Sequence, residues 1–334
     1  MSALIRPVVV TGGAGFIGSE VTRQLVEAGT EVIVVDNLIN GKKENLDGLL
    51  GQGARLKEID IRYTEAIGNL FRNAGTVFNL ACLGVRHSLH SPIENHEVNA
   101  TATLQLVKAA YDNNVDRFVH VSTSEVYGTA RWTPMGEDHP TTPETVYGAS
   151  KLAAEAYVRA WYRTHGYPTV IVRPFNAYGP RSHHEGDSGE VIPKMMLRAM
   201  AGLSLIVFGD GEQTRDFNFV SDTARGIILA GTSEEAIGET VNIGSGREVS
   251  IRELAEKVSA TTGRNECQIE FRDPRPGDVK RLCANSTRAS SLLGYQPTTK
   301  LSEGLKLLLN WYEISGLSPE ELLMSEVVEN WRLD

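Results

Sequence analysis

The chain has 334 residues, of which 41% are hydrophobic and 22% are charged, a balance typical of globular proteins. Its formal net charge of −9 argues against a general nucleic-acid-binding protein, because such proteins present basic surfaces to the phosphate backbone. The three cysteines (Cys82, Cys267 and Cys283) are far apart and odd in number, which indicates neither a disulfide framework nor a metal site. The sequence shows no apolar stretch of membrane-spanning length and no signal-peptide pattern. We therefore expect a cytoplasmic protein with no nucleic-acid or membrane partner and no metal.

The N-terminal region carries the pattern of a dinucleotide-binding unit. A β-branched run at 8–10 precedes a glycine-rich turn at 11–18, and a second apolar run ends in Asp36. The glycines permit a tight turn and a close approach of backbone to a pyrophosphate, whose charge the N-terminus of the following helix stabilises. A carboxylate at Asp36 can hydrogen-bond the adenosine ribose and would repel a 2′-phosphate. The unit therefore predicts NAD in preference to NADP.

Alternating strand and helix patterns continue as far as residue 122. Strands are predicted at 56–61, 76–81 and 117–122, with a helix from about 93 to 114. This alternation predicts an α/β fold with a Rossmann-type doubly wound parallel sheet, which binds ligands at the carboxyl ends of its strands. The triplet Thr123-Ser124-Glu125 follows the last of these strands, so we expect it at that edge.

Tyr147 and Lys151 lie four residues apart, and on a helix this spacing puts both on one face. Free tyrosine has a pKa of about 10 and is a poor base at neutral pH. The lysine ammonium and a positively charged nicotinamide would both favour the phenolate. Together they indicate a site that takes a proton from an alcohol while hydride leaves the same carbon. The same spacing also occurs by chance at the start of surface helices, and the glycine-rich turn is what favours the redox interpretation.

Seven motifs occur in the order typical of one family: TGGAGFIGS at 11–19, DNL at 36–38, STSEVYG at 122–128, YGASK at 147–151, RPFNAYGPR at 173–181, GDGEQTRDF at 209–217 and RPGD at 275–278. In these motifs the chain resembles the nucleotide-sugar branch of the extended short-chain dehydrogenase/reductase family. The resemblance implies that NAD stays bound and is reduced and reoxidised within one turnover. We expect NAD contacts at Gly12, Gly15, Phe16, Ile17, Gly18, Asp36, Asn37, Asp60, Ile61, Leu80, Ala81, Tyr147 and Lys151.

The resemblance also implies roles for individual residues. Tyr147 is the expected base on the sugar hydroxyl, Lys151 its electrostatic partner and ribose ligand, and Thr123 the hydroxyl that completes a proton relay. The nucleotide diphosphate sugar is expected to contact Asn176, Val191, Arg215 and Arg275, with Arg86 and Ser88 near the sugar. A guanidinium suits a diphosphate because its donors match two oxygens at once.

A smaller α/β substrate domain is expected in the second half, where loops lengthen after residue 176. We assign residues 1–175 plus about 219–246 to an NAD-binding domain, and about 176–218 plus 247–334 to a nucleotide-sugar-binding domain. The helices near 93–114 and 151–165 carry apolar and aromatic residues, and the resemblance implies that this pair forms a homodimer.

Three reactions fit the motifs, because oxidation of the sugar at C4 gives a 4-ketone that can be epimerised, dehydrated or decarboxylated. Glu125 favours a 4,6-dehydratase acting on an NDP-hexose or NDP-N-acetylhexosamine. Burying a carboxylate without a task costs free energy, and family epimerases resemble this segment with a small or neutral residue there. Dehydratases with a Thr-Ser-Glu motif and UDP-glucuronate decarboxylases resemble this chain, which leaves 4-epimerase and decarboxylase as alternatives. A non-catalytic NAD sensor would not need Tyr147, Lys151 or Thr123.

Ser124 departs from the many 4,6-dehydratases that carry an aspartate there as the acid for the leaving hydroxyl. Serine is too weak an acid for that task, so Glu125 would both take the C5 proton and protonate the leaving group. A structural role for Glu125, as a helix cap or the partner of an arginine, is the alternative. Cys82 is interpreted as a small buried core thiol, and the loop with His183 and His184 as a substrate lid rather than a metal site.

Overall fold

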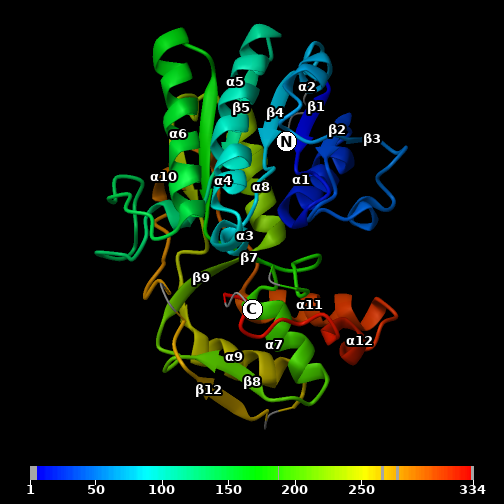
Figure 1. Ribbon diagram of the computed structural model, residues 1–334, viewed down its shortest axis with the longest axis vertical. Coiled ribbons are helices and arrows are strands. Elements are labelled where there is room, and N and C mark those ends of the chain that lie inside the picture. Colours follow the sequence, from blue (N-terminus) through cyan, green and yellow to red (C-terminus); the bar gives the residue numbers. More distant parts are fainter. Residues whose placement is uncertain (1–5, 187, 265–266, 276–277, 332–334) are drawn as a thin grey trace.

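The computed structural model describes residues 6–186, 188–264, 267–275 and 278–331. In this part of the chain seven strands form one parallel sheet in the order β10-β6-β5-β4-β1-β2-β3 (Figure 1). They are β1 (Val8–Thr11), β2 (Val32–Asp36), β3 (Ala54–Glu58), β4 (Thr76–Asn79), β5 (Arg117–Val121), β6 (Thr169–Pro174) and β10 (Thr240–Ile243). The strand order reverses between β1 and β4, and sheets of this kind bind ligands at that point.

Helices cover both faces of the sheet, as the predicted doubly wound fold requires. One face packs against α1 (Phe16–Glu27), α8 (Val220–Thr232) and α10 (Thr287–Leu293), and the other against α2 (Thr64–Phe71), α5 (Ala102–Asp112) and α6 (Val146–His165). Val8 and Val10 enter the first core and Val9 the second, because successive side chains of a strand point to opposite faces. The continuous apolar strands of the sequence follow from this double burial.

The helix predicted at 93–114 is interrupted. It consists of α4 (Pro92–His96), a π-helical segment η2 (Glu97–Thr101) and α5. Asn95 and Asn99 from this region hold the loop after β4: the Asn99 amide donates to the Leu83 carbonyl (2.9 Å) and accepts from the Leu83 N–H (2.9 Å), and the Asn95 amide donates to the same carbonyl (2.9 Å). π-Helical turns often occur at functional sites, and this one fixes a loop at the ligand-binding edge.

The lower region in Figure 1 has its own core, built on small sheets. Within the described residues a three-stranded sheet has the order β11-β9-β7 and a two-stranded sheet pairs β12 with β8. The elements are β7 (Asn176–Tyr178), α7 (Val191–Met200), β8 (Leu205–Phe208), β9 (Thr214–Phe219), β11 (Glu248–Ser250), α9 (Ile251–Thr261), β12 (Ile269–Arg272), α11 (Leu301–Ile314) and α12 (Pro319–Leu323). The short elements η1 (Lys43–Leu46), α3 (Val85–His90) and η3 (Ser124–Val126) belong to the upper region.

The C-terminal part of the chain does not pack entirely in the lower region. Ala289, Leu293 and Tyr295 belong to the core of the large sheet, so α10 departs from the domain division expected from the sequence. Its apolar face is buried against α8 and β10. With α10 moved to the NAD-binding part, the division remains our proposal.

A buried ion pair joins α6 to the sheet. Glu155 on α6 accepts hydrogen bonds at both carboxylate oxygens from Arg173 on β6, at 2.8 and 2.6 Å, and Arg159 approaches it at 3.6 Å. Arg173 also donates to the Tyr127 hydroxyl (2.8 Å), and this hydroxyl donates to Asn242 on β10 (2.8 Å). Glu155 and Arg173 are 0% and 3% exposed, so the pair fixes α6 against β6 and β10 without competition from water.

Replacing Arg173 with methionine should lower the free energy of unfolding by about 3–5 kcal/mol, because the Glu155 carboxylate would stay buried without its closest partner. The double variant Glu155→Leu/Arg173→Met should recover most of that loss. Arg6→Met is the control: it breaks the exposed pair with Asp116 and should cost less than about 1 kcal/mol. Urea unfolding measures all three, and equal losses in the two single variants would contradict the prediction.

Candidate active site

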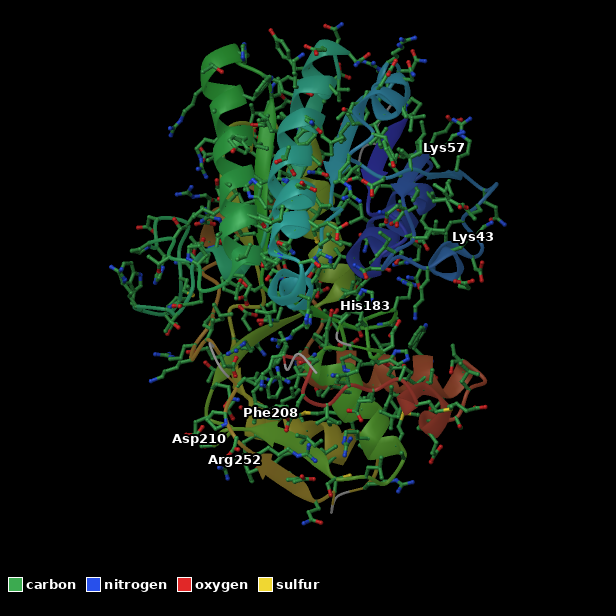
Figure 2. The ribbon with its side chains drawn as sticks, viewed as in Figure 1. Lys43, Lys57, His183, Phe208, Asp210 and Arg252 are labelled. Carbon is green, nitrogen blue, oxygen red and sulfur yellow. The ribbon has the colours of Figure 1, made fainter. Side chains whose placement is uncertain are left out.

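A cleft of about 880 Å³ lies at the carboxyl edge of the large sheet. It is lined by the glycine-rich turn, by residues that follow β2, β4 and β5, by the start of α6, and by residues of the lower region. Figure 2 shows His183 where the two regions meet, and His183 is one of the lining residues. The cleft is where the strand order predicts a ligand.

The glycine-rich turn forms the floor of one end of the cleft, where Gly12, Gly15, Phe16, Ile17 and Gly18 all line it. Gly12 has a φ of +69°, and a Cβ there would lie 2.7 Å from the Ala81 nitrogen. A Cβ at Gly18 would lie 2.0 Å from the Gly12 carbonyl oxygen, so any side chain would push α1 off the turn. No side chain caps the start of α1, which leaves its first N–H groups available to an anion.

The far wall at this end is made by the residues expected to bind adenosine. Asp36, Asn37, Asp60, Ile61, Leu80 and Ala81 all line the cleft. Asp36 accepts hydrogen bonds from the N–H groups of Ala14 (2.9 Å) and Leu38 (2.9 Å), which ties the strand end to the glycine-rich turn. Burial raises the pKa of Asp36, and these N–H groups oppose that effect.

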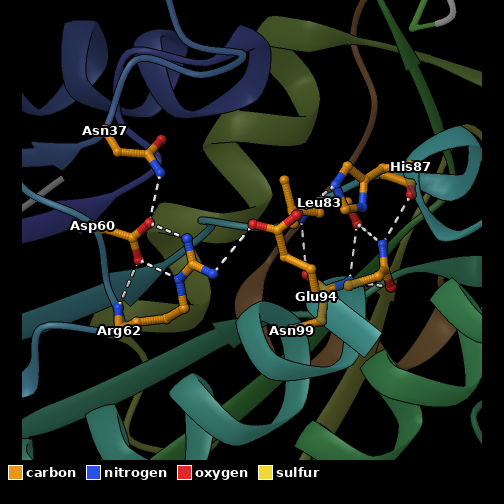
Figure 3. A network of polar contacts seen from close by, with 9 residues as sticks. Asn37, Asp60, Arg62, Leu83, His87, Glu94 and Asn99 are labelled. Carbon is orange, nitrogen blue, oxygen red and sulfur yellow. Dashed lines mark hydrogen bonds and ion pairs between the residues drawn. The ribbon is translucent and has the colours of Figure 1, made fainter. Parts of the chain in front are cut away.

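Asp60 does not stand free for a ligand. Its carboxylate accepts hydrogen bonds from Arg62 (2.8 and 3.0 Å) and Asn37 (3.0 Å), and chiefly the Arg62 contact lowers its pKa to about 2. Arg62 also pairs with the Glu94 carboxylate (3.2 Å), and this carboxylate lies 3.3 Å from the His87 ring nitrogen. The side chains therefore form one polar network along the cleft wall (Figure 3). No local pattern predicts this network, because Asn37, Asp60, His87 and Glu94 belong to separate segments of the chain.

Replacing Gly18 with alanine should abolish NAD binding, because the added Cβ overlaps the Gly12 carbonyl and separates the turn from α1. Gly68→Ala on α2 is the matched control: its Cβ would meet only the Asn113 side chain, at 3.7 Å, and should leave binding unchanged. Calorimetric titration with NAD measures both. Unaltered affinity in the Gly18 variant would contradict the assigned cofactor cradle.

Tyr147 and Thr123 meet in the cleft as expected. Tyr147 lies in the first turn of α6, which Thr145 caps by accepting the Gly148 N–H (3.1 Å). Burial raises the pKa of the Tyr147 phenol well above its usual value, the Thr123 hydroxyl lowers it through a hydrogen bond, and Cys82 and Glu125 raise it further. The side chains around the phenol therefore favour its neutral form.

Lys151 lies below the cleft rather than in its wall. It is 1% exposed, its ammonium donates to the Val121 carbonyl (2.7 Å), and burial lowers its pKa. The expected effect of Lys151 on the phenolate stays a prediction. Its position supports β5 immediately before the Thr123 turn.

The interpretation of Cys82 as a buried core thiol is wrong. Cys82 is exposed, lines the cleft and contacts the Tyr147 phenol. Cys82 is exposed because it lies two residues beyond Leu80, in the loop after β4. Asn95 and Asn99 fix this loop through hydrogen bonds to the Leu83 backbone. The sequence did carry one indication of this exposure, because Cys82 lies just past the carboxyl end of a parallel strand, where ligands bind.

Glu125 and Ser124 also line the cleft, in the short turn η3 after β5. The Glu125 N–H donates to the Thr123 hydroxyl (3.2 Å), which fixes the turn. Burial raises the pKa of Glu125, and the positive charges of Arg215 and Arg86 offset this only in part. The carboxylate therefore lies close to the phenol at one side and to arginines at the other.

Positive charge gathers at the end of the cleft away from the glycine-rich turn. Arg86, Arg215 and Arg275 line this part, together with Asn176 and Val191. Arg215 donates to the Val279 carbonyl (2.6 Å) and pairs with Asp278 (2.6 Å). Burial and the neighbouring Arg86 lower the pKa of Arg275 to about 10. Three guanidinium groups in one partly buried place suit an anionic ligand.

Ser88 and Asn176, both expected at the substrate, lie differently relative to the cleft. Ser88 does not reach the cleft: it is buried in α3, where its hydroxyl donates to the Val85 carbonyl (2.6 Å), so its expected sugar contact is wrong. Asn176 lines the cleft, and its buried amide oxygen accepts no hydrogen bond from the part of the chain that the structure describes.

The centre of the Arg275–Asp278 motif, residues 276–277, lies outside the described residues.

Among the described residues, no three His, Cys, Asp or Glu side chains gather as metal ligands would. In the same part of the chain, no helix has the length and apolar character needed to cross a membrane.

Comparisons with known proteins agree with this geometry. A family model described as GDP-mannose 4,6 dehydratase matches residues 9–308. The low-salt glycan biosynthesis protein Agl12 of Haloferax volcanii is 36% identical over 309 residues, covering 91% of this chain and 98% of that protein. The structure of UDP-glucose 4-epimerase from Thermotoga maritima with UDP-glucose has a TM-score of 0.86 at 33% identity, over 92% of this chain and 98% of that one. DesIV, a dTDP-glucose 4,6-dehydratase from Streptomyces venezuelae with NAD and TYD bound, has a TM-score of 0.87 at 31% identity, over 92% and 97%.

Proposed function

Because the chain belongs to the extended short-chain dehydrogenase/reductase family of nucleotide-sugar epimerases and dehydratases, we propose that it is an NAD-dependent nucleotide-sugar 4,6-dehydratase. The observation that carries the proposal is the Glu125 carboxylate, which lies in the cleft within electrostatic reach of Tyr147. An epimerase needs only the phenol and its relay, whereas elimination of water needs a second group that moves protons.

The cofactor end fits NAD. The turn at Gly12 and Gly18 has no room for side chains, which lets a pyrophosphate approach its backbone. The Asp36 carboxylate lies in the cleft wall, where it would accept hydrogen bonds from a ribose and repel a 2′-phosphate. Bound NAD would supply the redox chemistry, accepting hydride from C4 of the sugar and returning it at C6.

The first proton transfer belongs to Tyr147, which accepts the proton of the C4 hydroxyl. Its own surroundings hold it in the neutral form, so the transfer requires positive charge beside the phenol, as the oxidised nicotinamide provides. The hydrogen bond from Thr123 works in the same direction by lowering the phenol pKa. This requirement couples proton removal to the presence of the oxidised cofactor.

The elimination belongs to Glu125. In the 4-ketone the C5 proton is acidic, and Glu125 takes it to leave an enolate. As the enolate electron pair forms the C5–C6 double bond, the C6–O bond breaks and Glu125 gives the same proton to the leaving hydroxyl, so that water departs. Return of hydride to C6 would then be balanced by uptake of one proton at C5, equal to the proton first removed from the C4 hydroxyl. The raised pKa of Glu125 suits a group that must act first as base and then as acid. Ser124 lines the cleft but cannot act as that acid, since a hydroxyl is far too weak.

The substrate diphosphate is held at the basic end. Arg215 and Arg275 are placed to bind it, and Asn176 lines the same part of the cleft, where the N–H groups of its amide can donate to a phosphate oxygen. Val191 begins α7 at the cleft, where a helix N-terminus favours negative charge. Arg86 lies near Glu125, on the side where the sugar must lie.

Mass spectrometry of products tests the proposed reaction. The purified protein is incubated with NAD and UDP-, dTDP-, GDP- and CDP-sugars, glucuronate included. A product lighter by one water supports the dehydratase. A product of unchanged mass that separates by chromatography would replace it with a 4-epimerase, and loss of carbon dioxide would replace it with a decarboxylase.

Two substitutions separate the proton transfers. Tyr147→Phe should abolish turnover and cofactor reduction, because it removes the group assigned to take the C4 proton. Glu125→Gln should lower the rate of formation of the dehydrated product by about 10²-fold or more. The transient absorbance of the reduced nicotinamide should persist. Glu256→Gln on the exposed side of α9 is the control for Glu125→Gln. Dehydration at the normal rate by Glu125→Gln would show that another group acts as base.

A further inference from the structure

Arg275 packs against two aromatic rings. Its guanidinium lies 4.6 Å from the centre of the Phe208 ring and 5.1 Å from the centre of the Trp331 ring. The two rings meet edge to face, with centres 4.6 Å apart at 88°. Phe208 ends β8 in the lower region (Figure 2), whereas Trp331 is near the C-terminus. Two segments far apart in the chain therefore hold Arg275, a residue of the cleft, between their aromatic rings.

The contacts that hold Arg275 differ from those that hold the neighbouring Arg215. Arg215 is fixed by an ion pair with Asp278 and by backbone carbonyls, so part of its charge is already compensated. Arg275 lies near Arg86 and Arg215, whose like charges repel it, and the Asp278 carboxylate offsets this repulsion only in part. Aromatic faces attract a cation without neutralising it. Arg275 is thus held in place with its charge available to an anion.

The chain segment that carries Trp331 is attached to the substrate side of the cleft. After α12, residues 324–331 run along α7 and the loop before it. Arg198 of α7 pairs with Glu326 (2.7 Å), and the Lys194 ammonium donates to the Val327 carbonyl (2.7 Å). The Gly186 N–H donates to the Ser325 carbonyl (2.8 Å).

The end of this segment is buried against the cleft wall. Asn330 is 3% exposed, and its amide lies 3.5 Å from the Gly189 carbonyl oxygen. Gly189 and its neighbour Glu190 line the cleft. Since the family model ends its match at residue 308, the whole segment lies beyond the region that the chain shares with that model.

We propose that residues 324–331 complete the nucleotide-sugar site, and that Trp331 is a positioning residue that holds Arg275 toward the substrate diphosphate. The inference rests on the proposed function, because it takes the diphosphate as the anion that Arg275 meets. Without the indole, repulsion from Arg86 and Arg215 turns the Arg275 side chain away, and the diphosphate loses one of its cationic partners. The adenosine end of the cleft, which is built from other loops, is unaffected.

The test compares Trp331→Ala with Trp331→Phe and Trp132→Ala. The probes are UDP, dTDP, GDP and CDP, followed by titration calorimetry, with NAD titrated separately. Trp331→Ala should weaken binding of the preferred nucleoside diphosphate by about 3- to 30-fold and raise KM for its sugar with little change in kcat. NAD affinity should not change. Trp331→Phe should restore most of the loss, since it keeps an aromatic face.

Trp132→Ala is the matched control, because this tryptophan is 51% exposed and its ring packs at a tilt of 50° against the ring of His139, outside the cleft. It should bind nucleoside diphosphates like the parent protein. The variants Arg275→Ala and Arg275→Ala/Trp331→Ala complete a double-mutant cycle. If Trp331 acts through Arg275, the double variant should bind no more weakly than Arg275→Ala alone.

The outcomes separate the two proposals. If the parent protein binds a nucleoside diphosphate and Trp331→Ala binds it equally well, the role of Trp331 is wrong and the proposed function stands. The same holds if the two substitutions add in full. If the parent protein binds none of the four nucleoside diphosphates, the proposed function fails and the inference fails with it. An equal loss of NAD affinity in Trp331→Ala would indicate general misfolding and would also contradict the inference.

Discussion

Glu155 and Arg173 form an ion pair that is almost closed to water, and the chemistry of the cleft depends on where this pair holds α6. Tyr147 and Lys151 are on that helix, whereas Thr123 and Glu125 follow β5. Because residues 122–145 separate β5 from α6 in the chain, the packing of α6 and this ion pair help to set the distance between the phenol and the relay. A charged pair that must stay buried is costly to break, which makes the arrangement rigid where proton transfer requires it.

The electrostatics of the cleft divide it into three parts with different tasks. The glycine-rich turn brings backbone close to a ligand without adding charge. The centre, around Tyr147, favours the neutral phenol and needs a cation for proton removal. The far end groups the guanidinium side chains of Arg86, Arg215 and Arg275 and suits a diphosphate. A nucleotide sugar and NAD would therefore meet at the centre, where the oxidised nicotinamide would supply the positive charge that the protein lacks.

The shared fold accounts for the cofactor and the substrate class but not for the reaction. Structures named for an epimerase and for a dehydratase match the chain about equally well, with TM-scores of 0.86 and 0.87. The reaction must therefore depend on a few side chains around the sugar. Glu125 is the one that the chain offers for elimination, and Cys82 beside the phenol is a second feature of this small region.

Sequence alone determined the features that depend on local pattern: the apolar parallel strands, the glycine-rich turn with Asp36, and the helix that presents Tyr147. These follow from periodicity and from backbone geometry that only glycine permits, so neighbouring residues carry the information. Tertiary structure decided what depends on distant segments. It brought Cys82 into the cleft, withdrew Ser88 from it, placed Lys151 below it, and set Trp331 against Arg275. No local pattern encodes such contacts, because each depends on how the loops of one region pack against another.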